Sequence, residues 1–430
     1  MALRIDSRAP DFEEALGRLL AMKREVSQDV DEAVRAIIAD VAERGDAAVI
    51  DYTRRFDGLE LTPETLRVTP AEIEEALARC DAKTLAALET AKARIEAFHR
   101  RQRPEDVTFT DDLGVGLGWR WTAIEAVGLY VPGGTASYPS SVLMNAVPAK
   151  VAGVPRIVMV VPSPRGELNP LVLAAAHLAG VDEIYRIGGA QAVAALAFGT
   201  QTIAPVAKIV GPGNAYVAAA KRRVFGTVGI DMIAGPSEVL VLADSSANPA
   251  WVAADLLAQA EHDTAAQSVL ITDDAALADA VEQAVEDQLK TLPRAAIAGA
   301  SWRDFGAVIV VGRLAEALPI VDRFAPEHLE ILAEDADSLA AGVRNAGAIF
   351  LGGYTPEAIG DYVGGSNHVL PTARSARFSS GLGVLDFMKR TSILRCGPEG
   401  LRALADAAIA LGEAEGLDAH ARSVAIRLNR

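Results

Sequence analysis

Five short apolar runs decide the expected fold: AVGLYVPGG (126–134), RIVMVVPSP (156–164), EIYRIGGAQA (183–192), KIVGPGNA (208–215) and SEVLVLAD (237–244). Gly or Pro follows each run, and Ala-rich helical segments separate them, so the pattern predicts βαβ units and a parallel sheet. In such sheets a ligand binds at the carboxyl ends of the strands, where these turns fall. The pattern continues in AQSVLITDD (266–274), GAVIVVG (306–312) and GAIFLGG (347–353), which predicts a second α/β unit beginning near residue 240.

The two ends of the chain are predicted to be helical. Apolar residues recur three and four apart from residue 10 to about residue 103, and the helical pattern returns from about residue 385. The cluster HRRQR (99–103) falls at the end of the first region, where cations complement the helix dipole, so we expect a solvated helix end.

Composition excludes several classes of protein. The chain has 430 residues, with 41 Lys and Arg against 57 Asp and Glu, and its net charge of −16 argues against nucleic acid or an anionic membrane as the main partner. It has only 2 cysteines, which form neither a disulfide framework nor a cysteine-rich zinc site. Neither a signal peptide nor a membrane-spanning stretch is evident. We therefore expect a cytoplasmic protein.

The glycine-rich turns permit a nucleotide but do not demonstrate one. Backbone N–H groups at a helix start suit phosphates. However, no G-x-G-x-x-G follows a strand, and GPGNAYVAAAK (211–221) resembles a phosphate loop only loosely. On their own, these turns are slightly more typical of simple connections between strands and helices than of nucleotide-binding loops.

Titratable residues gather in the second half of the chain. NPAWVAADLLAQAEHD (248–263) is predicted to be one helix, with Gln259 and His262 on one face near its end, either as metal ligands or as a polar helix end. Glu327 and His328 follow Pro326, and adjacent side chains in extended backbone point in opposite directions. This pair would supply two proton carriers to one site, or it would lie in a surface loop.

Two further segments contribute polar side chains. GDYVGGSNHVLPT (360–372) is expected to be a functional loop that contains Asp361 and His368. Glu415 and His420, in EAEGLDAHARS (413–423), are expected on two different helices.

Taken together, these segments resemble the histidinol dehydrogenase family. The resemblance rests on eight motifs in the family's order: YVPGGTASYPSSVLMNAVPAKVAGV, RIGGAQAVAALAFGT, IVGPGNAYVAAAKR, IDMIAGPSEVLVLAD, LLAQAEHD, RFAPEHLEI, GDYVGGSNHVLPT and AEGLDAHARSV. It implies a zinc-dependent, NAD-linked enzyme of histidine biosynthesis that oxidises L-histidinol through L-histidinaldehyde to L-histidine, with one zinc per subunit and two NAD reduced.

The resemblance also implies roles for particular residues. The zinc ligands would be Gln259, His262, Asp361 and His420. The general acid and base would be Glu327 and His328. Substrate contacts would come from Ser237, Glu415, His328 and the zinc ligands, and NAD contacts from Tyr130, Gln191 and Asn214. His368 receives less weight and no assigned role.

The family's fold is an intertwined homodimer of two incomplete Rossmann-like units, in which His420 and Glu415 complete the partner's site. We accordingly expect an N-terminal helical segment (1–25), a metal and catalytic α/β domain (26–125 plus 240–380), an NAD-contacting domain (126–239) and a C-terminal helical segment (381–430). The alternatives are a zinc- and NAD-dependent dehydrogenase of another small alcohol, a zinc hydrolase, and a catalytically inactive scaffold.

Overall fold

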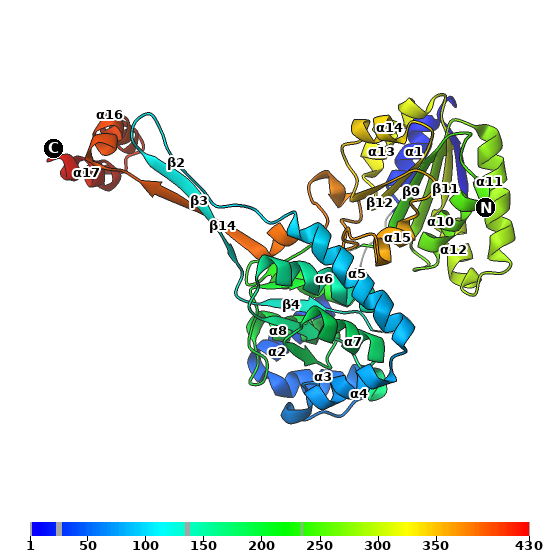
Figure 1. Ribbon diagram of the computed structural model, residues 1–430, viewed down its shortest axis with the longest axis horizontal. Coiled ribbons are helices and arrows are strands. Elements are labelled where there is room, and N and C mark those ends of the chain that lie inside the picture. Colours follow the sequence, from blue (N-terminus) through cyan, green and yellow to red (C-terminus); the bar gives the residue numbers. More distant parts are fainter. Residues whose placement is uncertain (1, 23–27, 134–137, 234, 430) are drawn as a thin grey trace.

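The structure is a computed structural model that describes residues 2–22, 28–133, 138–233 and 235–429. Two α/β units, each built on a parallel sheet, lie side by side, and a narrow arm projects from them (Figure 1). In the described part of the chain, none of the helices combines the length and apolarity needed to cross a membrane.

The first unit contains a five-stranded parallel sheet. Its strands, in spatial order, are β6 (Glu183–Tyr185), β5 (Ile157–Val160), β4 (Val127–Tyr130), β7 (Lys208–Val210) and β8 (Gly229–Ile230). All four residues of β4 and of β5 are buried, because helices cover both faces of the sheet. The helices of this unit are α2 (Gln28–Arg44), α3 (Asp46–Asp57), α4 (Pro70–Arg79), α5 (Ala82–Arg100), α6 (Pro139–Ala152), α7 (Pro170–Ala179), α8 (Gly189–Phe198) and α9 (Ala215–Val224).

The second unit contains a six-stranded parallel sheet. Its order is β1 (Leu3–Asp6), β11 (Ala307–Val310), β10 (Gln267–Thr272), β9 (Glu238–Ala243), β12 (His328–Leu332) and β13 (Ala348–Leu351). The residue His328 pairs with Val239 on one side and Ala348 on the other. The helices are α1 (Phe12–Leu20), α10 (Pro249–Ala260), α11 (Ala275–Leu289), α12 (Ala295–Phe305), α13 (Leu318–Phe324), α14 (Ala336–Gly342) and α15 (Glu357–Tyr362). Short 3₁₀ turns occupy Pro63–Thr65, Pro164–Gly166, Leu314–Ala317, Ser375–Arg377, Val384–Phe387 and Ile426–Leu428.

The expected domain assignment is wrong for the helices before residue 125. The apolar faces of α2 and α3 pack against one face of the five-stranded sheet, and those of α4 and α5 pack in the core on its other face. Residues 28–100 therefore belong to the first unit rather than to the catalytic one. The spacing of apolar residues predicts an amphipathic helix but does not specify which sheet it covers. The expected boundary at residues 25 and 26 lies outside the described residues.

Two terminal segments also differ from a purely helical expectation. Leu3–Asp6 forms the edge strand β1 before the helix α1 begins. Met388–Arg395 forms β14, which pairs antiparallel with β3 (Gly116–Ala123), and β3 in turn pairs with β2 (Val107–Thr110). This three-stranded ribbon carries α16 (Pro398–Ala414) and α17 (Asp418–Ala425) away from both units (Figure 1).

Candidate active site

A cavity of about 1310 Å³ is lined by residues of both α/β units. The first unit lines it with the turns that follow β4, β6 and β7, at the carboxyl ends of these strands, as the sequence predicts. The second unit contributes the opposite edge: Ser237 immediately precedes β9, and His328 is the first residue of β12. The cavity therefore lies at the carboxyl ends of the strands of the first sheet, but at the amino ends of β9 and β12 in the second.

Glu327 and His328 lie together at the wall of this cavity. Oε2 of Glu327 is 3.8 Å from Nδ1 of His328, so the two side chains do not point to opposite sides, as alternation along a strand would require. Glu327 precedes the first residue of β12, and its Oε2 accepts a hydrogen bond from the backbone N–H of Glu238 at 2.9 Å. This bond turns the carboxylate toward the imidazole. The pair is buried, not part of a surface loop.

One hydrogen bond defines the tautomer of His328. Its Nδ1 lies 3.1 Å from the backbone carbonyl of Glu238, so Nδ1 carries the proton and donates. Nε2 is left with its lone pair and has no hydrogen-bond partner among the described residues. Burial lowers the pKa of His328 to about 3, which keeps the imidazole neutral near pH 7. Its Nε2 is therefore available to accept a proton.

Three of the four predicted zinc ligands lie near this base. Gln259 is the penultimate residue of α10, and its amide nitrogen lies 2.8 Å from Nδ1 of His262. The predicted N-cap of this helix is confirmed, because the side chain of Asn248 accepts from the backbone N–H of Ala250 and Pro249 is the first helical residue. Asp361 lies on α15, with Oδ1 at 3.8 Å from Nε2 of His328.

The donors present suit a divalent cation. The buried Oε1 of Gln259 has no hydrogen-bond donor among the described residues. Burial raises the pKa of Asp361, and no Lys or Arg in the described chain forms an ion pair with this carboxylate. A cation would satisfy both oxygens, and a mixed nitrogen and oxygen set is compatible with zinc.

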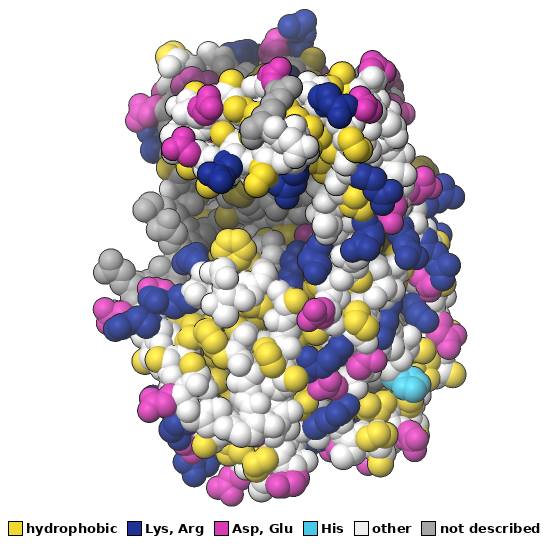
Figure 2. All heavy atoms as spheres, turned by 90° about the vertical axis from the view of Figure 1, so that its left-hand side faces the viewer, with side chains coloured by type: hydrophobic (Ala, Val, Ile, Leu, Met, Phe, Trp, Pro, Cys, Tyr) yellow, Lys and Arg dark blue, Asp and Glu magenta, His cyan; other side chains and the backbone are white. Residues whose placement is uncertain are grey.

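Glu415 and His420 do not join this site within the same chain. Glu415 caps the end of α16 and His420 lies on α17, and both are exposed on the arm, away from the two sheets (Figure 1). The arm also exposes large apolar side chains. Figure 2 views the molecule from the side of the arm, and its upper part shows apolar side chains among charged ones. The most exposed are Leu394 at 69%, Leu411 at 63% and Ile426 at 59%.

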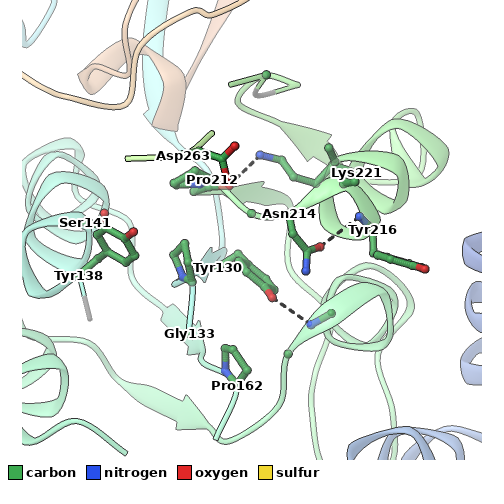
Figure 3. Close-up of a pocket in the computed structure, with 18 of the residues that line it drawn as sticks. Tyr130, Gly133, Tyr138, Ser141, Pro162, Pro212, Asn214, Tyr216, Lys221 and Asp263 are labelled. Carbon is green, nitrogen blue, oxygen red and sulfur yellow. Dashed lines mark hydrogen bonds between the residues drawn. The ribbon is translucent and has the colours of Figure 1, made fainter. Parts of the chain in front are cut away.

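The three residues expected to contact NAD line the first unit's side of the cavity. Asn214 caps α9 through its side chain, which accepts from the backbone N–H groups of Tyr216 and Val217 (Figure 3). The hydroxyl of Tyr130 accepts from the backbone N–H of Gly189 at 2.9 Å, which ties β4 to the first turn of α8. Gln191 lies on α8, and its buried Oε1 has no partner in the described chain. Two helix N-termini therefore face the cavity and can bind an anion.

Sequence reasoning missed several residues of the site. Glu357 is 2% exposed and its Oε1 is 3.5 Å from Nδ1 of His328. Its ligand atom and those of His328 and Asp361 all lie within 4.8 Å of one another. The helical spacing from Glu357 to Asp361 was the available signal, because residues four apart share one helix face. His368, which the sequence analysis named without assigning a role, also lines the cavity and donates from Nδ1 to the backbone carbonyl of Asp361 at 3.0 Å.

The cavity has a neutral imidazole beside carboxylates on one side and two helix N-termini that can bind an anion on the other. This arrangement is typical of an α/β enzyme that transfers protons to and from a ligand bound next to a phosphate-bearing cofactor. This geometry defines the class of protein but leaves the substrate open.

Comparison with known proteins narrows the class. The model of the histidinol dehydrogenase family matches residues 20–428. A histidinol dehydrogenase of Bradyrhizobium diazoefficiens is 71% identical over 429 residues, covering 100% of both chains, and one of Rhodopseudomonas palustris is 70% identical over 430 residues with the same coverage. The crystal structure of histidinol dehydrogenase from Elizabethkingia anophelis superimposes with a TM-score of 0.95 at 36% identity, covering 100% of this chain and 98% of that one. The chain belongs to the histidinol dehydrogenase family and is an oxidoreductase.

Proposed function

We propose that this enzyme oxidises L-histidinol through L-histidinaldehyde to L-histidine, reducing two NAD, as the last step of histidine biosynthesis in the cytoplasm. The observation that carries this proposal is the neutral His328 with Nε2 unpaired, 3.8 Å from Asp361 and with Glu327 beside it. Family membership supports L-histidinol as the substrate, and the Glu327–His328 pair supports a site with two proton carriers.

In this proposal one zinc ion per subunit is held by Gln259, His262, Asp361 and His420 of the partner subunit. When bound, zinc would fix the imidazole and amine of the substrate and so orient its alcohol. Ser237 lines the cavity and would contact the substrate together with Glu415 of the partner subunit, because a carboxylate complements the substrate's ammonium group. The exposed arm supports the partner's contribution, which requires a homodimer.

The chain's own residues would perform the proton transfers. Nε2 of His328 accepts the alcohol proton as a hydride leaves the carbinol carbon for the first NAD. Glu327 takes a proton from the water that adds to the aldehyde, and His328 returns the alcohol proton to the carbonyl oxygen, which forms the hydrate and restores the neutral imidazole. His328 then accepts a hydroxyl proton of the hydrate as the second hydride leaves for the second NAD. Tyr130, Gln191 and Asn214 would place the cofactor at the turns of the first unit.

The stoichiometry of the reaction tests this proposal directly. We expect two NADH for each L-histidinol consumed, measured by NADH absorbance and by quantifying L-histidine. One NADH per substrate would indicate an alcohol dehydrogenase that stops at the aldehyde, and faster turnover of another small alcohol would indicate a different substrate. A hydrolase would form no NADH.

Replacement of a predicted zinc ligand tests the metal centre. We expect His262→Asn to lower zinc content at equilibrium and to raise the KM for histidinol, since the imidazole would be lost from the ligand set. The matched control is His177→Asn on the exposed surface of α7, which should retain wild-type zinc content. Unchanged zinc content in His262→Asn, measured by elemental analysis, would contradict the ligand assignment.

A further inference from the structure

The loop that follows α15 is held by the first α/β unit, although α15 itself belongs to the second. Residues 363–368 connect Asp361, a predicted zinc ligand, to His368 at the cavity wall. The helix α5 lies on the side of the first unit that faces the second (Figure 1), and its side chains contact this loop. A helix leaves its last carbonyl groups without partners of its own, so their hydrogen bonds must come from elsewhere.

Arg94 on α5 supplies donors to two carbonyls at the end of α15. Its Nε donates to the carbonyl of Val363, the C-cap residue of this helix, at 2.6 Å, and its Nη2 donates to the carbonyl of Gly364 at 3.0 Å. The planar guanidinium presents its N–H groups as a rigid fork, so one side chain can satisfy two successive carbonyls. Its positive charge also complements the negative end of the helix dipole. One residue of the first unit thus completes a helix of the second.

The backbone of the loop lies directly against the first unit. Gly365 has φ +105, and a Cβ there would lie 3.0 Å from the carbonyl oxygen of Arg94. Asn367 is 7% exposed, and its Nδ2 donates to the carbonyl of Met144 on α6 at 2.7 Å while its Oδ1 accepts from the backbone N–H of Val369 at 2.9 Å. The first unit therefore holds the loop both at its start and near its end.

A further contact from the first unit leads back to Asp361. Ser141 on α6 donates from Oγ to Nε2 of His368 at 3.3 Å, and Nδ1 of His368 donates to the backbone carbonyl of Asp361 at 3.0 Å. The carbonyl of Asp361 is thus bound on one side of the loop, and those of Val363 and Gly364 are bound on the other.

We propose that Arg94 is a positioning residue through which the first unit fixes the orientation of Asp361. Asp361 is two residues before Val363, in the last turn of α15, and its Oδ1 lies 3.8 Å from Nε2 of His328. The helix has only 6 residues, and so short a helix depends on contacts from outside it. Arg94 is not among the described residues that line the cavity, so it acts on the site through the end of α15 and not by contact with the ligand.

The consequence for metal binding rests on the proposed zinc centre. Arg94→Met keeps the apolar stem of the side chain but removes both bonds. We expect it to raise the zinc Kd, measured with Zn²⁺ alone in competition with a chelator, by about tenfold. It should also raise the KM for histidinol more than it lowers kcat. Arg94→Lys keeps the charge and can donate to one of the carbonyls, so it should recover part of the loss.

Two controls separate positioning from loss of charge and from general destabilisation of α5. Arg101→Met removes an exposed cation at the C-cap of the same helix and should keep the wild-type zinc Kd. Leu88→Ala removes a buried side chain on the core side of α5 and leaves both bonds of Arg94 in place. Its melting temperature should fall while its zinc Kd stays at the wild-type value. An Arg94→Met enzyme with wild-type zinc affinity and KM would overturn the proposal, and so would an equal loss of zinc affinity in Leu88→Ala.

Hydrogen–deuterium exchange tests the contact in the metal-free enzyme. In Arg94→Met the amide protons of residues 357–368 should exchange about tenfold faster than in wild type, because two charge-assisted hydrogen bonds to this segment are lost. Leu88→Ala should keep the wild-type rate there. Unchanged protection of the segment in Arg94→Met would overturn the proposal. A wild-type enzyme that binds no Zn²⁺ would instead contradict the proposed metal centre, and the exchange rates would then decide the role of Arg94.

Discussion

At the scale of single residues, the environment of His328 is built from backbone as much as from side chains. The carbonyl of Glu238 fixes the proton on Nδ1, and the N–H of Glu238 holds the carboxylate of Glu327. Both proton carriers are thus anchored to the backbone of one residue on the neighbouring strand β9, which pairs with β12. Their separation of 3.8 Å follows from sheet register and needs no ion pair.

Substitution should separate the roles of Glu327 and His328 in the two oxidation steps. In Glu327→Gln the amide cannot take a proton from water, so hydration of the aldehyde loses its base while His328 still serves the alcohol step. We expect oxidation of supplied L-histidinaldehyde to slow by about 10²–10⁴-fold, with a smaller effect on the first NADH formed from L-histidinol. Equal damage to both half-reactions would contradict this division of roles.

At the scale of elements, the turn between β7 and α9 depends on a buried ion pair. Nζ of Lys221 pairs with Oδ1 of Asp231 and also donates to the carbonyl of Gly211 at 3.0 Å, while the N–H of Gly211 donates to Oδ2 of Asp231 at 2.7 Å. Gly211 has φ +104, and a Cβ there would lie 2.2 Å from the carbonyl oxygen of Tyr130. The pair therefore holds a turn that only glycine can make.

We expect Lys221→Met to disturb this turn and the cofactor contacts of Asn214, because it leaves Asp231 buried without its counter-charge. The free energy of unfolding should fall by about 3–5 kcal/mol, and the KM for NAD should rise. The neighbouring Arg222→Met, at an exposed position of the same helix, should change stability by no more than about 0.5 kcal/mol. An unchanged KM for NAD in Lys221→Met would refute the link between the ion pair and cofactor binding.

The C-terminal end of α5 contains a buried histidine that makes stability sensitive to pH. The cluster HRRQR is a solvated helix end only in part: the arginines are exposed, but His99 is 0% exposed. Its Nδ1 donates to the carbonyl of Ile95 at 2.7 Å, and its Nε2 lies 3.4 Å from the amide of Asn367 in the loop before β14. Burial lowers the pKa of His99, which favours the neutral imidazole in the folded enzyme.

This residue makes stability depend on pH in a predictable direction. Below a pH of about 6.5 the unfolded chain takes up a proton at His99 more readily than the folded chain does, so stability falls as pH decreases. Between pH 7.5 and 5.5, His99→Gln should therefore lose less unfolding free energy than wild type, as measured by urea denaturation. The exposed control His177→Gln should follow the wild-type curve. Parallel curves for His99→Gln would refute this assignment.

The sequence predicts local structure well because local spacing determines it. The apolar runs at 126–134 and 266–274 become β4 and β10, and the Asn248–Pro249 pair opens α10. The sequence does not predict that α2 and α3 cover the five-stranded sheet, since an apolar stripe fits either sheet. It also does not predict that Ser237 and His328 lie at the amino ends of their strands, because that depends on how the two units face each other.

At the scale of the whole molecule, the ligands of the proposed metal centre are divided between the body of the chain and its arm. His262 and Asp361 line the cavity, and the amide of Gln259 contacts His262, whereas His420 lies on the projecting arm, which exposes apolar side chains (Figure 1). In the proposed homodimer, a second copy of the chain would bury this arm and receive His420 at its own cavity.

Mixed dimers test this arrangement. His262→Asn and His420→Asn homodimers should both be inactive, but a mixed dimer would contain one site with both native histidines. Random reassembly of equal amounts should restore about a quarter of wild-type activity, since half of the dimers would be mixed and each would have one intact site. His262→Asn mixed with Asp361→Asn is the control and should stay inactive, because both losses fall on the body of the chain. Absence of recovery in the first mixture would indicate that each site is completed within one chain.

The edge position of β1 has a consequence for biosynthesis. Leu3–Asp6 pairs only with β11, whose residues Ala307–Val310 leave the ribosome about 300 positions later, a delay on the order of 15–60 s at bacterial rates of elongation. The five-stranded unit can form in that interval, because its strands and helices are complete by residue 230. Leu3–Asp6 is thus among the last segments to find its place although it is translated well before its partner strand, and it must remain unpaired through most of synthesis, exposed to nascent-chain chaperones and proteases.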